Sequence, residues 1–333
     1  MSAPAPPMYS DQATGFASKL GLTMGRANLE VFADTLQELA TANRDVVAVT
    51  SDSRGSGKLG PYGQALPKQI IEVGIAEQNL VGIAAGLASV GKTVFAVSPA
   101  CFLTARSFEQ VKNDVAYSDN PVTLVGISAG VSYGALGSTH HSLHDFAALR
   151  AVNNVTIVAP ADNIEARDAV RAAALHPSPV YLRFGKAPLY DLSPGPSFAF
   201  GSARLIRSGD DAAFIASGET VIHALLAAAH LEETTGLQCR VISVPTIKPL
   251  DVNAILDAAN ECRAIVTVEE HMINGGLGEA CAAVLAQSEL KPRFKIIGIP
   301  DEYTVTGSQA DIFRHYGISM EGLAASMRGV LGT

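Results

Sequence analysis

The sequence predicts an α/β protein with two domains, each a three-layer α/β/α sandwich around a mainly parallel sheet. Short apolar runs alternate with helical periodicities along almost the whole chain, which is typical of parallel strands covered by helices. The 333 residues are enough for about two domains. A proline-rich stretch without periodicity, residues 186–200, interrupts the alternation. We therefore expect domains at residues 25–192 and 193–333, preceded by a flexible tail at residues 1–24.

Composition excludes several classes of protein. Hydrophobic residues make up 48% of the chain and the mean hydropathy is +0.23, so a disordered chain is not expected. The net charge of −8 predicts no nucleic-acid surface, and no apolar run reaches the length of a membrane span. The 4 cysteines form no CxxC pair, which argues against a metal site and favours the reducing cytoplasm.

The expected elements follow the alternation of apolar runs and helical spacing. In the first domain we expect strands at 46–50, 69–73, 93–97, 122–127, 155–159 and 180–184. The helices between them are expected at 26–43, 76–90, 104–118, 143–152 and 163–175. In the second domain we expect strands at 212–217, 239–244, 264–269 and 295–299, with helices at 220–233, 251–260 and 277–286.

Two nucleotide-binding motifs match the sequence but not their structural context. GLASVGKT (86–93) fits the P-loop pattern, yet its glycines end a helix and Lys92 opens a strand. A P-loop needs the reverse order, because phosphate binds at a helix N-terminus and is repelled by a C-terminus. GSGKLG (55–60) fits the dinucleotide pattern, with Glu72 as the candidate ribose acid, but Pro61 and Pro67 interrupt the helix that should follow.

Glu77 stands at a strand-to-helix turn and has two interpretations. It is either an acid in the first turn that complements the helix dipole, or a functional carboxyl at the carboxyl end of a parallel strand, where α/β sites form. The helix behind it is rich in residues small enough for close packing on its own sheet or on another subunit, namely Gly82, Ala84, Ala85, Gly86 and Ala88.

A glycine-rich loop, residues 128–142, carries hydroxyls and histidines and is typical of a functional loop. His140, His141 and His144 lie within five positions of each other, which favours a site over three isolated structural histidines. Zinc is a poor fit, because no cysteine or paired acid accompanies them at ligand spacing. Arg183 and Lys186 end a strand, where they either hold an anion or form an ordinary solvated strand end.

Four linked segments resemble the pyrimidine-binding half of transketolases and the related deoxyxylulose-phosphate synthases: VGIAEQNLVGIAAGLAS (73–89), FLTARSFEQVKNDVA (102–116), GSTHHSLHDFAALRAV (137–152) and PADNIEARDAV (160–170). VEEHMINGGLGEA (268–280) resembles their C-terminal domain. A complete transketolase chain is about twice as long and begins with a domain that holds the diphosphate and Mg²⁺ of thiamine diphosphate through a GDG…N segment, which this sequence lacks.

The resemblance therefore implies the second subunit of a split transketolase. Its first domain would bind the pyrimidine of thiamine diphosphate, and a separate subunit would hold the diphosphate and Mg²⁺. Because such sites are shared between chains, the resemblance also implies self-association to at least a dimer, in an α2β2 heterotetramer.

The resemblance assigns roles to residues of both segments. Glu77 would bond the pyrimidine N1′ and His140 would contact a substrate hydroxyl or phosphate, so these two form the implied catalytic pair. Ile75, Phe102 and Phe108 would pack around the pyrimidine. The implied substrate-binding residues, several of them for phosphate, are Arg26, Ser56, Ser128, His140, His141 and Lys186.

The sequence also departs from the family, and the departures bear on the substrate. Leu136 replaces an acid that reads a sugar hydroxyl, Ala105 replaces a third aromatic, and Ser128 replaces a histidine. We expect a transketolase for an unusual sugar phosphate, branched or modified. The alternative is the β subunit of a 2-oxoacid dehydrogenase E1 component, which shares the fold and the glutamate; the GSTHHSLHD segment favours the first.

Overall fold

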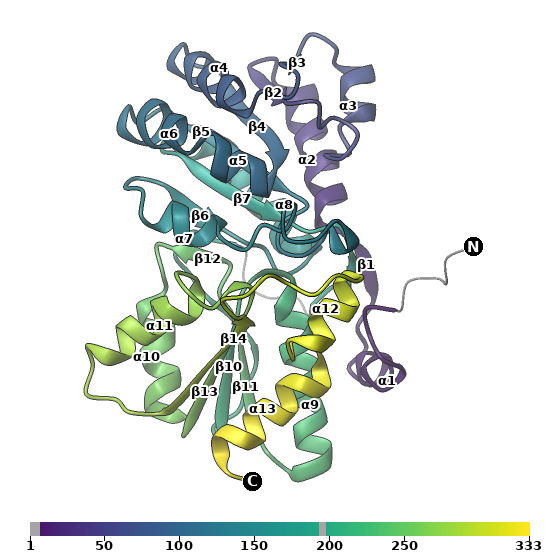
Figure 1. Cartoon of the computed structure of the whole chain (residues 1–333), viewed down its shortest axis with the longest axis vertical. Coiled ribbons are helices and arrows are strands. Elements are labelled where there is room, and N and C mark those ends of the chain that lie inside the picture. Colours follow the sequence, from purple (N-terminus) through teal and green to yellow (C-terminus); the bar gives the residue numbers. More distant parts are fainter. Residues whose placement is uncertain (1–6, 193–197) are drawn as a thin grey trace.

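The protein consists of two α/β domains placed one above the other along the longest axis (Figure 1). The computed structural model describes residues 7–192 and 198–333. In Figure 1 the first domain is mostly purple to teal and the second mostly green to yellow, except that the purple α1 (Asp11–Lys19) lies beside α9 (Val221–Thr235) and the green β12 (Thr246–Lys248) joins the first sheet. Both are built on sheets with mainly parallel strands and with helices on the two faces, so the predicted fold class is confirmed.

The sheet of the first domain has seven strands in the order β12-β6-β7-β5-β4-β2-β3. They are β2 (Val46–Thr50), β3 (Ile70–Glu72), β4 (Thr93–Pro99), β5 (Val122–Ile127), β6 (Thr156–Val158), β7 (Val180–Phe184) and β12 (Thr246–Lys248). The first six are parallel, whereas β12 pairs with β6 in the antiparallel sense. Since β12 lies after the linker, the second half of the chain completes the edge of this sheet.

Helices cover both faces of this sheet. One face carries α2 (Asn28–Ala42), α3 (Gly60–Ala65) and α8 (Asn163–Leu175). The other carries α4 (Glu77–Ser89), α5 (Ala100–Arg106), α6 (Phe108–Gln110), the π-helix η1 (Val111–Tyr117) and α7 (Asp145–Arg150). The single helix expected at 104–118 is therefore wrong, because α5, α6 and η1 divide that stretch. A short 3₁₀ turn, η2 (Gly134–Leu136), lies in the glycine-rich loop.

The second domain has five strands in the order β14-β13-β10-β11-β9. They are β9 (Arg204–Arg207), β10 (Ala212–Ala216), β11 (Cys239–Ser243), β13 (Ala264–Met272) and β14 (Arg293–Ile299). The helices are η3 (Gly218–Thr220), α9 (Val221–Thr235), α10 (Val252–Glu261), α11 (Leu277–Ala286), α12 (Gln309–His315) and α13 (Met320–Leu331). The sequence interpretation missed α12 and α13, although Ser308 and Ser319 cap their N-termini.

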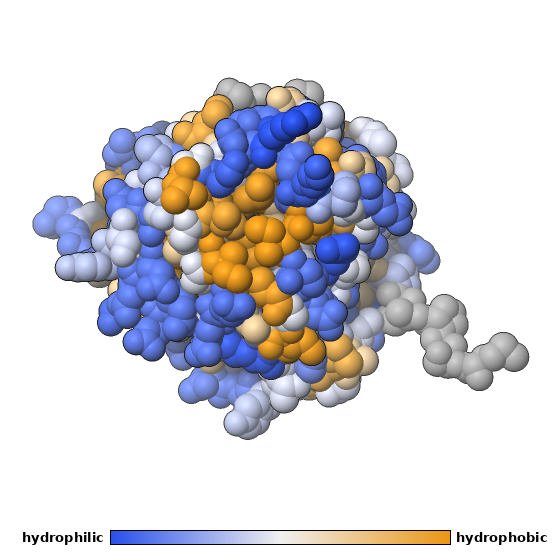
Figure 2. Space-filling view, turned by 90° about the horizontal axis from the view of Figure 1, so that it is seen from above, coloured by the Kyte–Doolittle hydropathy of each residue, from blue (hydrophilic) through white to orange (hydrophobic). Residues whose placement is uncertain are grey.

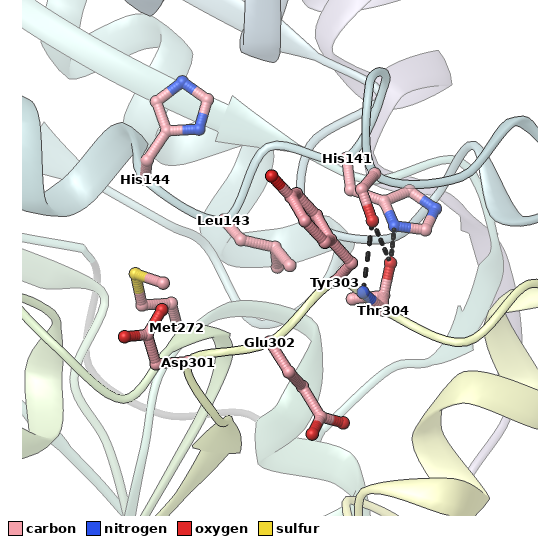
Figure 3. Close-up of a pocket in the computed structure, with 9 residues that line it drawn as sticks. His141, Leu143, His144, Met272, Asp301, Glu302, Tyr303 and Thr304 are labelled. Carbon is pink, nitrogen blue, oxygen red and sulfur yellow. Dashed lines mark hydrogen bonds between the residues drawn. The ribbon is translucent and has the colours of Figure 1, made fainter.

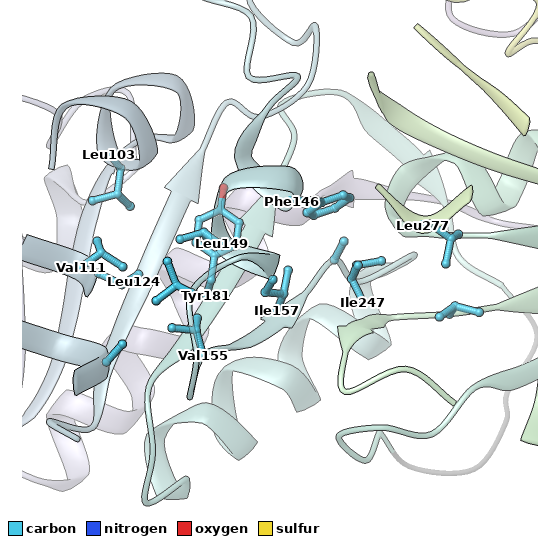
Figure 4. Packing of buried hydrophobic residues seen from close by; sticks show 14 of the residues in the cluster. Leu103, Val111, Leu124, Phe146, Leu149, Val155, Ile157, Tyr181, Ile247 and Leu277 are labelled. Atoms are coloured by element: carbon cyan, nitrogen blue, oxygen red, sulfur yellow. The ribbon is translucent and has the colours of Figure 1, made fainter. Parts of the chain in front are cut away.

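One hydrophobic cluster joins the two domains. It runs from Leu103 and Leu124 in the first domain through Phe146 to Ile247 and Leu277, which belong to the second half of the chain (Figure 4). A continuous apolar core of this kind holds the two sheets in a fixed relation. Side chains of the second domain can therefore support groups of the first.

Residues 7–24 are not the flexible tail that we expected. α1 (Asp11–Lys19) begins after the cap Ser10, and Phe16 and Ala17 are buried in the same cluster as α9. β1 (Met24–Ala27) then pairs with β8 (Pro188–Tyr190), which lies in the stretch expected to be a linker. Residues 1–6 and 193–197 lie outside the described part of the chain, and so does the predicted domain junction at 193.

The structure bears on both rejected motifs. α4 ends at Ser89 and β4 begins at Thr93, so Lys92 follows a helix C-terminus and a P-loop is excluded, as predicted. The prolines, however, do not prevent a helix after GSGKLG: Pro61 stands in the first turn of α3, where a missing amide costs little. Glu72 accepts hydrogen bonds from the amides of Asp52 and Gly74, which gives it a structural use. Among the described residues, no helix is both long and apolar enough to cross a membrane.

Candidate functional site

Glu77 is a buried carboxyl at the mouth of a hollow. β3 ends at Glu72, the chain turns through Gly74 (φ +73°), and α4 starts at Glu77 itself. The Glu77 side chain is 4% exposed, and Arg106 Nη1 donates to its Oε1 at 2.9 Å. Six residues line a hollow of about 620 Å³: Ile75, Ala76, Glu77, Gln78, Asn79 and Arg106. A buried acid that opens on a hollow is suited to hold a polar group of a ligand.

A line of aromatic rings extends from Glu77 into the glycine-rich loop. The Arg106 guanidinium carbon lies 4.1 Å from the centre of the Phe102 ring. Phe102 meets His140 edge to face, with ring centroids 5.4 Å apart, and Tyr133 also meets His140 edge to face, at 5.5 Å. His140 therefore contacts the rings of both Phe102 and Tyr133.

Hydroxyl and ammonium groups gather at the far end of this line. Lys186 Nζ lies 4.6 Å from the centre of the Tyr133 ring. Burial lowers the pKa of Lys186, and the positive charge of Lys58 adds to that shift. Burial raises the pKa of Tyr133, while the nearby hydroxyls of Ser128 and Ser56 oppose the rise. Lys186 and these hydroxyls make a suitable place for an anion such as a phosphate, whereas the Lys58 ammonium lies 3.5 Å from Glu30 Oε1.

The three neighbouring histidines have different surroundings. His141 is 3% exposed; its Nδ1 is 2.7 Å from Thr304 Oγ1 and its Nε2 is 2.9 Å from the Gly134 carbonyl (Figure 3). Burial lowers the pKa of His141, which favours the neutral form of its ring. Both ring nitrogens are thus used inside the protein, and the predicted contact of His141 with substrate finds no support. His144 lines a hollow of about 610 Å³ that His141 and Tyr303 also line.

Two further predicted residues do not join the line of rings. The Arg26 guanidinium is bound by Glu30 and Asp34 on α2, and these contacts raise its pKa, chiefly through Asp34. Phe108 lies on a different hollow, of about 360 Å³, with Lys112 and Tyr117. The roles of Arg26 in phosphate binding and of Phe108 in pyrimidine binding therefore remain predictions that this arrangement does not favour.

Arg106 and Tyr133 are the two site residues that the sequence interpretation missed. Arg106 follows Phe102 by four positions, and residues four apart lie on one face of a helix, so its place could have been found from spacing. Tyr133 lies in an irregular loop, and no periodicity could have placed it beside Lys186.

Part of a thiamine diphosphate site fits the residues present. The buried carboxyl of Glu77 and the exposed side chain of Ile75 line one hollow, and Arg106, which also lines it, lies over the Phe102 ring. Such a hollow suits a flat heteroaromatic ring with a basic nitrogen. Among the described residues no group of three His, Cys, Asp or Glu is placed to hold a metal ion.

Comparison with known proteins identifies the family of this chain. The sequence matches the transketolase pyrimidine-binding domain over residues 25–190 and the transketolase C-terminal domain over residues 201–323. An apulose-4-phosphate transketolase subunit from Phocaeicola vulgatus is 50% identical over 294 residues, or 88% of this chain and 93% of that protein. The chain belongs to the transketolase family.

Other members agree with this placement. The Actinobacillus succinogenes protein of the same name is 38% identical over 84% of this chain and 90% of its own length. A solved structure described as a split-gene transketolase, inactive beta4 tetramer, superposes with a TM-score of 0.82 at 32% identity, over 92% of this chain and 99% of that one. The transketolase interpretation is thus confirmed over the E1 β alternative, and the chain is a transketolase-type transferase subunit.

Proposed function

We propose that this chain is the pyrimidine-binding subunit of a thiamine diphosphate-dependent transketolase, which transfers two-carbon ketol units between sugar phosphates. A separate subunit holds the diphosphate and Mg²⁺. The observation that carries the proposal is the continuous line from the buried Glu77 through Phe102 and His140 to Lys186. It offers a proton-holding group, a ring for stacking and an anion site in the order that this reaction needs.

Each residue of the line has a task. Bound thiamine diphosphate supplies the electron sink that lets a C–C bond beside a ketose carbonyl break. Glu77 holds a proton at the pyrimidine N1′, and the apolar α4 behind it excludes water from that hydrogen bond. Phe102 packs against the ring, and His140 orients a hydroxyl or phosphate of the sugar. Lys186, with Ser56 and Ser128 nearby, binds the sugar phosphate.

Exposed apolar side chains around α4 support assembly with other chains. Ile75 and Val90, at the two ends of α4, are 73% and 74% exposed, and Tyr117 on η1 is 90% exposed. Figure 2, which looks down on the end of the molecule that carries α4, shows apolar residues gathered in the middle of this face. Monomers rarely expose such patches. This face contacts a second copy and the diphosphate-binding subunit in an α2β2 assembly, which is cytoplasmic, in keeping with four free, buried cysteines.

The substrate is an unusual sugar phosphate, branched or modified. Two relatives are named for apulose-4-phosphate. Leu136 takes the place of the family's sugar-reading acid and is 55% exposed on η2, where it offers an apolar contact in place of a hydrogen bond. A sugar that carries carbon where common ketoses carry a hydroxyl would suit this change.

The test is reconstitution with the diphosphate-binding subunit. The complex should transfer two-carbon units from a ketose phosphate, and the chain alone should show no turnover. Glu77→Gln should lower kcat by at least about 100-fold, the usual contribution of a positioned proton-transfer group, without loss of the fold. Glu109→Gln, at an exposed acid on α6, is the matched control and should retain activity.

Branched and unbranched ketose phosphates should be compared with 2-oxoacids as donors. Full activity of Glu77→Gln would remove the role of Glu77. Transfer of acyl groups from 2-oxoacids to a lipoyl carrier, without ketol transfer, would overturn the transketolase assignment.

A further inference from the structure

The groups proposed to bind the sugar phosphate stand on two segments of the first domain. Lys186 follows the end of β7, while Ser128, Tyr133 and His140 belong to the glycine-rich loop between β5 and α7. Neither segment is a helix or a strand where these groups stand. Something else must hold them, because a site that is loose by about 1 Å loses much of its effect.

The end of β7 is held by a carboxyl of the second domain. Glu219, in the 3₁₀ turn η3 before α9, accepts a hydrogen bond from the Gly185 amide at 3.0 Å. A Cβ on Gly185 would lie only 2.2 Å from Glu219 Oε2, so this approach needs a glycine. Gly185 immediately precedes Lys186, and Glu219 therefore fixes the direction in which Lys186 leaves the strand.

The glycine-rich loop is held by a second carboxyl of the same domain. Glu270, on β13, accepts a hydrogen bond from the Val131 amide at 2.9 Å and another from Gln309 Nε2 at 2.8 Å. A Cβ on Gly130 would lie 2.1 Å from the Glu270 carboxyl carbon. The Gly130 carbonyl in turn accepts from the Ser142 amide at 2.8 Å, which closes the base of the loop.

Arg183 connects the segment bound by Glu219 to the loop bound by Glu270. Its Nε donates to Asp145 at 2.8 Å, and its Nη2 donates to the carbonyls of Ser142 and Glu270 at 3.1 and 2.7 Å. One buried guanidinium thus joins the strand that leads to Lys186, the far end of the loop and β13 of the second domain. A buried network of hydrogen bonds of this kind favours one arrangement of its members.

We propose that Glu219 and Glu270 of the second domain are positioning residues for the sugar-phosphate site of the first. Glu219 sets Lys186 and Glu270 sets the loop that carries Tyr133 and His140. The second domain touches no substrate in this scheme; it acts through the backbone of Gly185 and Val131. The inference rests on the proposed function, since Lys186 and His140 are substrate groups only in a transketolase of this kind.

The two carboxyls also make the positioning depend on pH. Burial and the negative charge of Glu270 raise the pKa of Glu219 to about 8, with Arg183 opposing the rise; Tyr9 also lies near enough to feel its charge. Burial raises the pKa of Glu270 to about 7, against the effect of Arg183. An ionised carboxylate accepts a stronger hydrogen bond than a neutral carboxyl. The hydrogen bond from the Gly185 amide to Glu219 should therefore strengthen as pH rises through about 8, and the KM for sugar phosphate should fall.

The test uses the reconstituted complex with three variants. Above about pH 8, where Glu219 is ionised, Glu219→Ala removes a charge-assisted hydrogen bond and should raise the KM for sugar phosphate about tenfold, with kcat little changed. Glu219→Gln keeps a hydrogen-bond acceptor, so its KM should return most of the way to the wild-type value. Its KM should no longer change near pH 8, because the amide does not titrate. Glu269→Gln is the matched control: it is a buried acid of β13 that accepts its hydrogen bonds from amides of α11, so KM and its pH profile should stay those of the wild type.

Two readouts on the purified chain do not depend on activity. Amide hydrogen exchange across residues 128–144 and 184–187 should quicken in Glu219→Ala and Glu270→Ala and stay unchanged in Glu269→Gln. The native Glu219 keeps its proton between about pH 4.5 and 8, whereas the unfolded chain releases it, so this residue lowers stability as pH rises through that window. The Tm of Glu219→Gln minus the Tm of the wild type should therefore increase as pH increases.

The outcomes separate this inference from the proposed function. Unchanged KM, pH profile and exchange in the Glu219 variants would overturn the inference even in an active complex. A wild-type complex without ketol transfer would overturn the proposed function, and the exchange experiment would then still decide whether the second domain holds these segments.

Discussion

The Glu77 side of the site and the Lys186 side differ in what supports them. Glu77 is 4% exposed, but its ion-pair partner Arg106 is 49% exposed and stands at an open hollow. On the other side Arg183 is 7% exposed, and its acid partners Asp145 and Glu270 are 0% and 3% exposed. The pyrimidine side therefore leaves contacts open for another chain, whereas the substrate side is already fixed inside this one.

This difference suits a subunit that shares its site. The second domain supplies hydrogen bonds and an apolar core to the substrate side and does not reach the hollow at Glu77. The groups on the substrate side are already ordered in the folded chain. A ligand that binds there therefore loses little affinity to the conformational entropy of ordering them. A cofactor at Glu77 instead gains its remaining contacts when the subunits assemble.

The largest expected effect is on stability, and it separates the two arginines. Arg183→Met should lower the free energy of unfolding by about 3–5 kcal/mol, because it leaves buried acids without their cation. Burial alone would raise the pKa of Asp145, but Arg183 and His271 hold it below its usual value, so the ionised form depends on them. Arg106→Met should cost less, about 1 kcal/mol, because Arg106 is half exposed and water from the hollow reaches the ion pair. Urea unfolding of the purified chain measures both; equal losses would contradict the comparison.

The next effect is on substrate binding. Lys186→Ala should raise the KM for a sugar phosphate about 10–100-fold, the range for a hydrogen bond to a charged group, while kcat changes less. Lys186→Arg should recover most of the loss, since either cation can bind phosphate. Lys92→Ala is the matched control, because Lys92 binds Asp45 at the surface and belongs only to the rejected P-loop match. An unchanged KM in Lys186→Ala would move the anion site elsewhere.

The sequence predicted the sheets far better than the support of the site. Apolar runs such as 46–50 and 122–127 are short, continuous and bounded, so their strands could be read directly. α1 and α12 are short, and their burial depends on contacts distant in sequence, so the capping residues Ser10 and Ser308 alone did not identify them. For the same reason β12, which joins the sheet of the other domain, was not foreseen.

The candidate site divides in the same way. Glu77, Phe102, His140 and Lys186 were predicted from a resemblance to a family, and in the structure they lie along one line of contacts, so their roles stay predictions. His141 lies in the same family-like segment as His140. Its ring, however, is hydrogen-bonded to Thr304, which lies in a loop distant in sequence. Whether a side chain faces the substrate or the interior depends on such tertiary contacts, and one sequence does not contain them in readable form.

The smallest expected effect concerns the cofactor and tests the open side directly. Arg106 spans Glu77 and the Phe102 ring, the two groups that a pyrimidine would contact, so the ring can reach both only after Arg106 withdraws. Because Arg106 is half exposed, breaking the ion pair costs about 1 kcal/mol. Arg106→Met should therefore bind thiamine diphosphate up to about fivefold more tightly in the complex, by isothermal titration calorimetry.

Arg106→Lys is the matched variant and should fall between Arg106→Met and the wild type, because it keeps the charge but loses the planar contact with Phe102. Weaker binding in Arg106→Met would mean that Arg106 contacts the cofactor itself. The pyrimidine side would then be fixed within this chain as firmly as the Lys186 side, and the contrast between the two sides would fail.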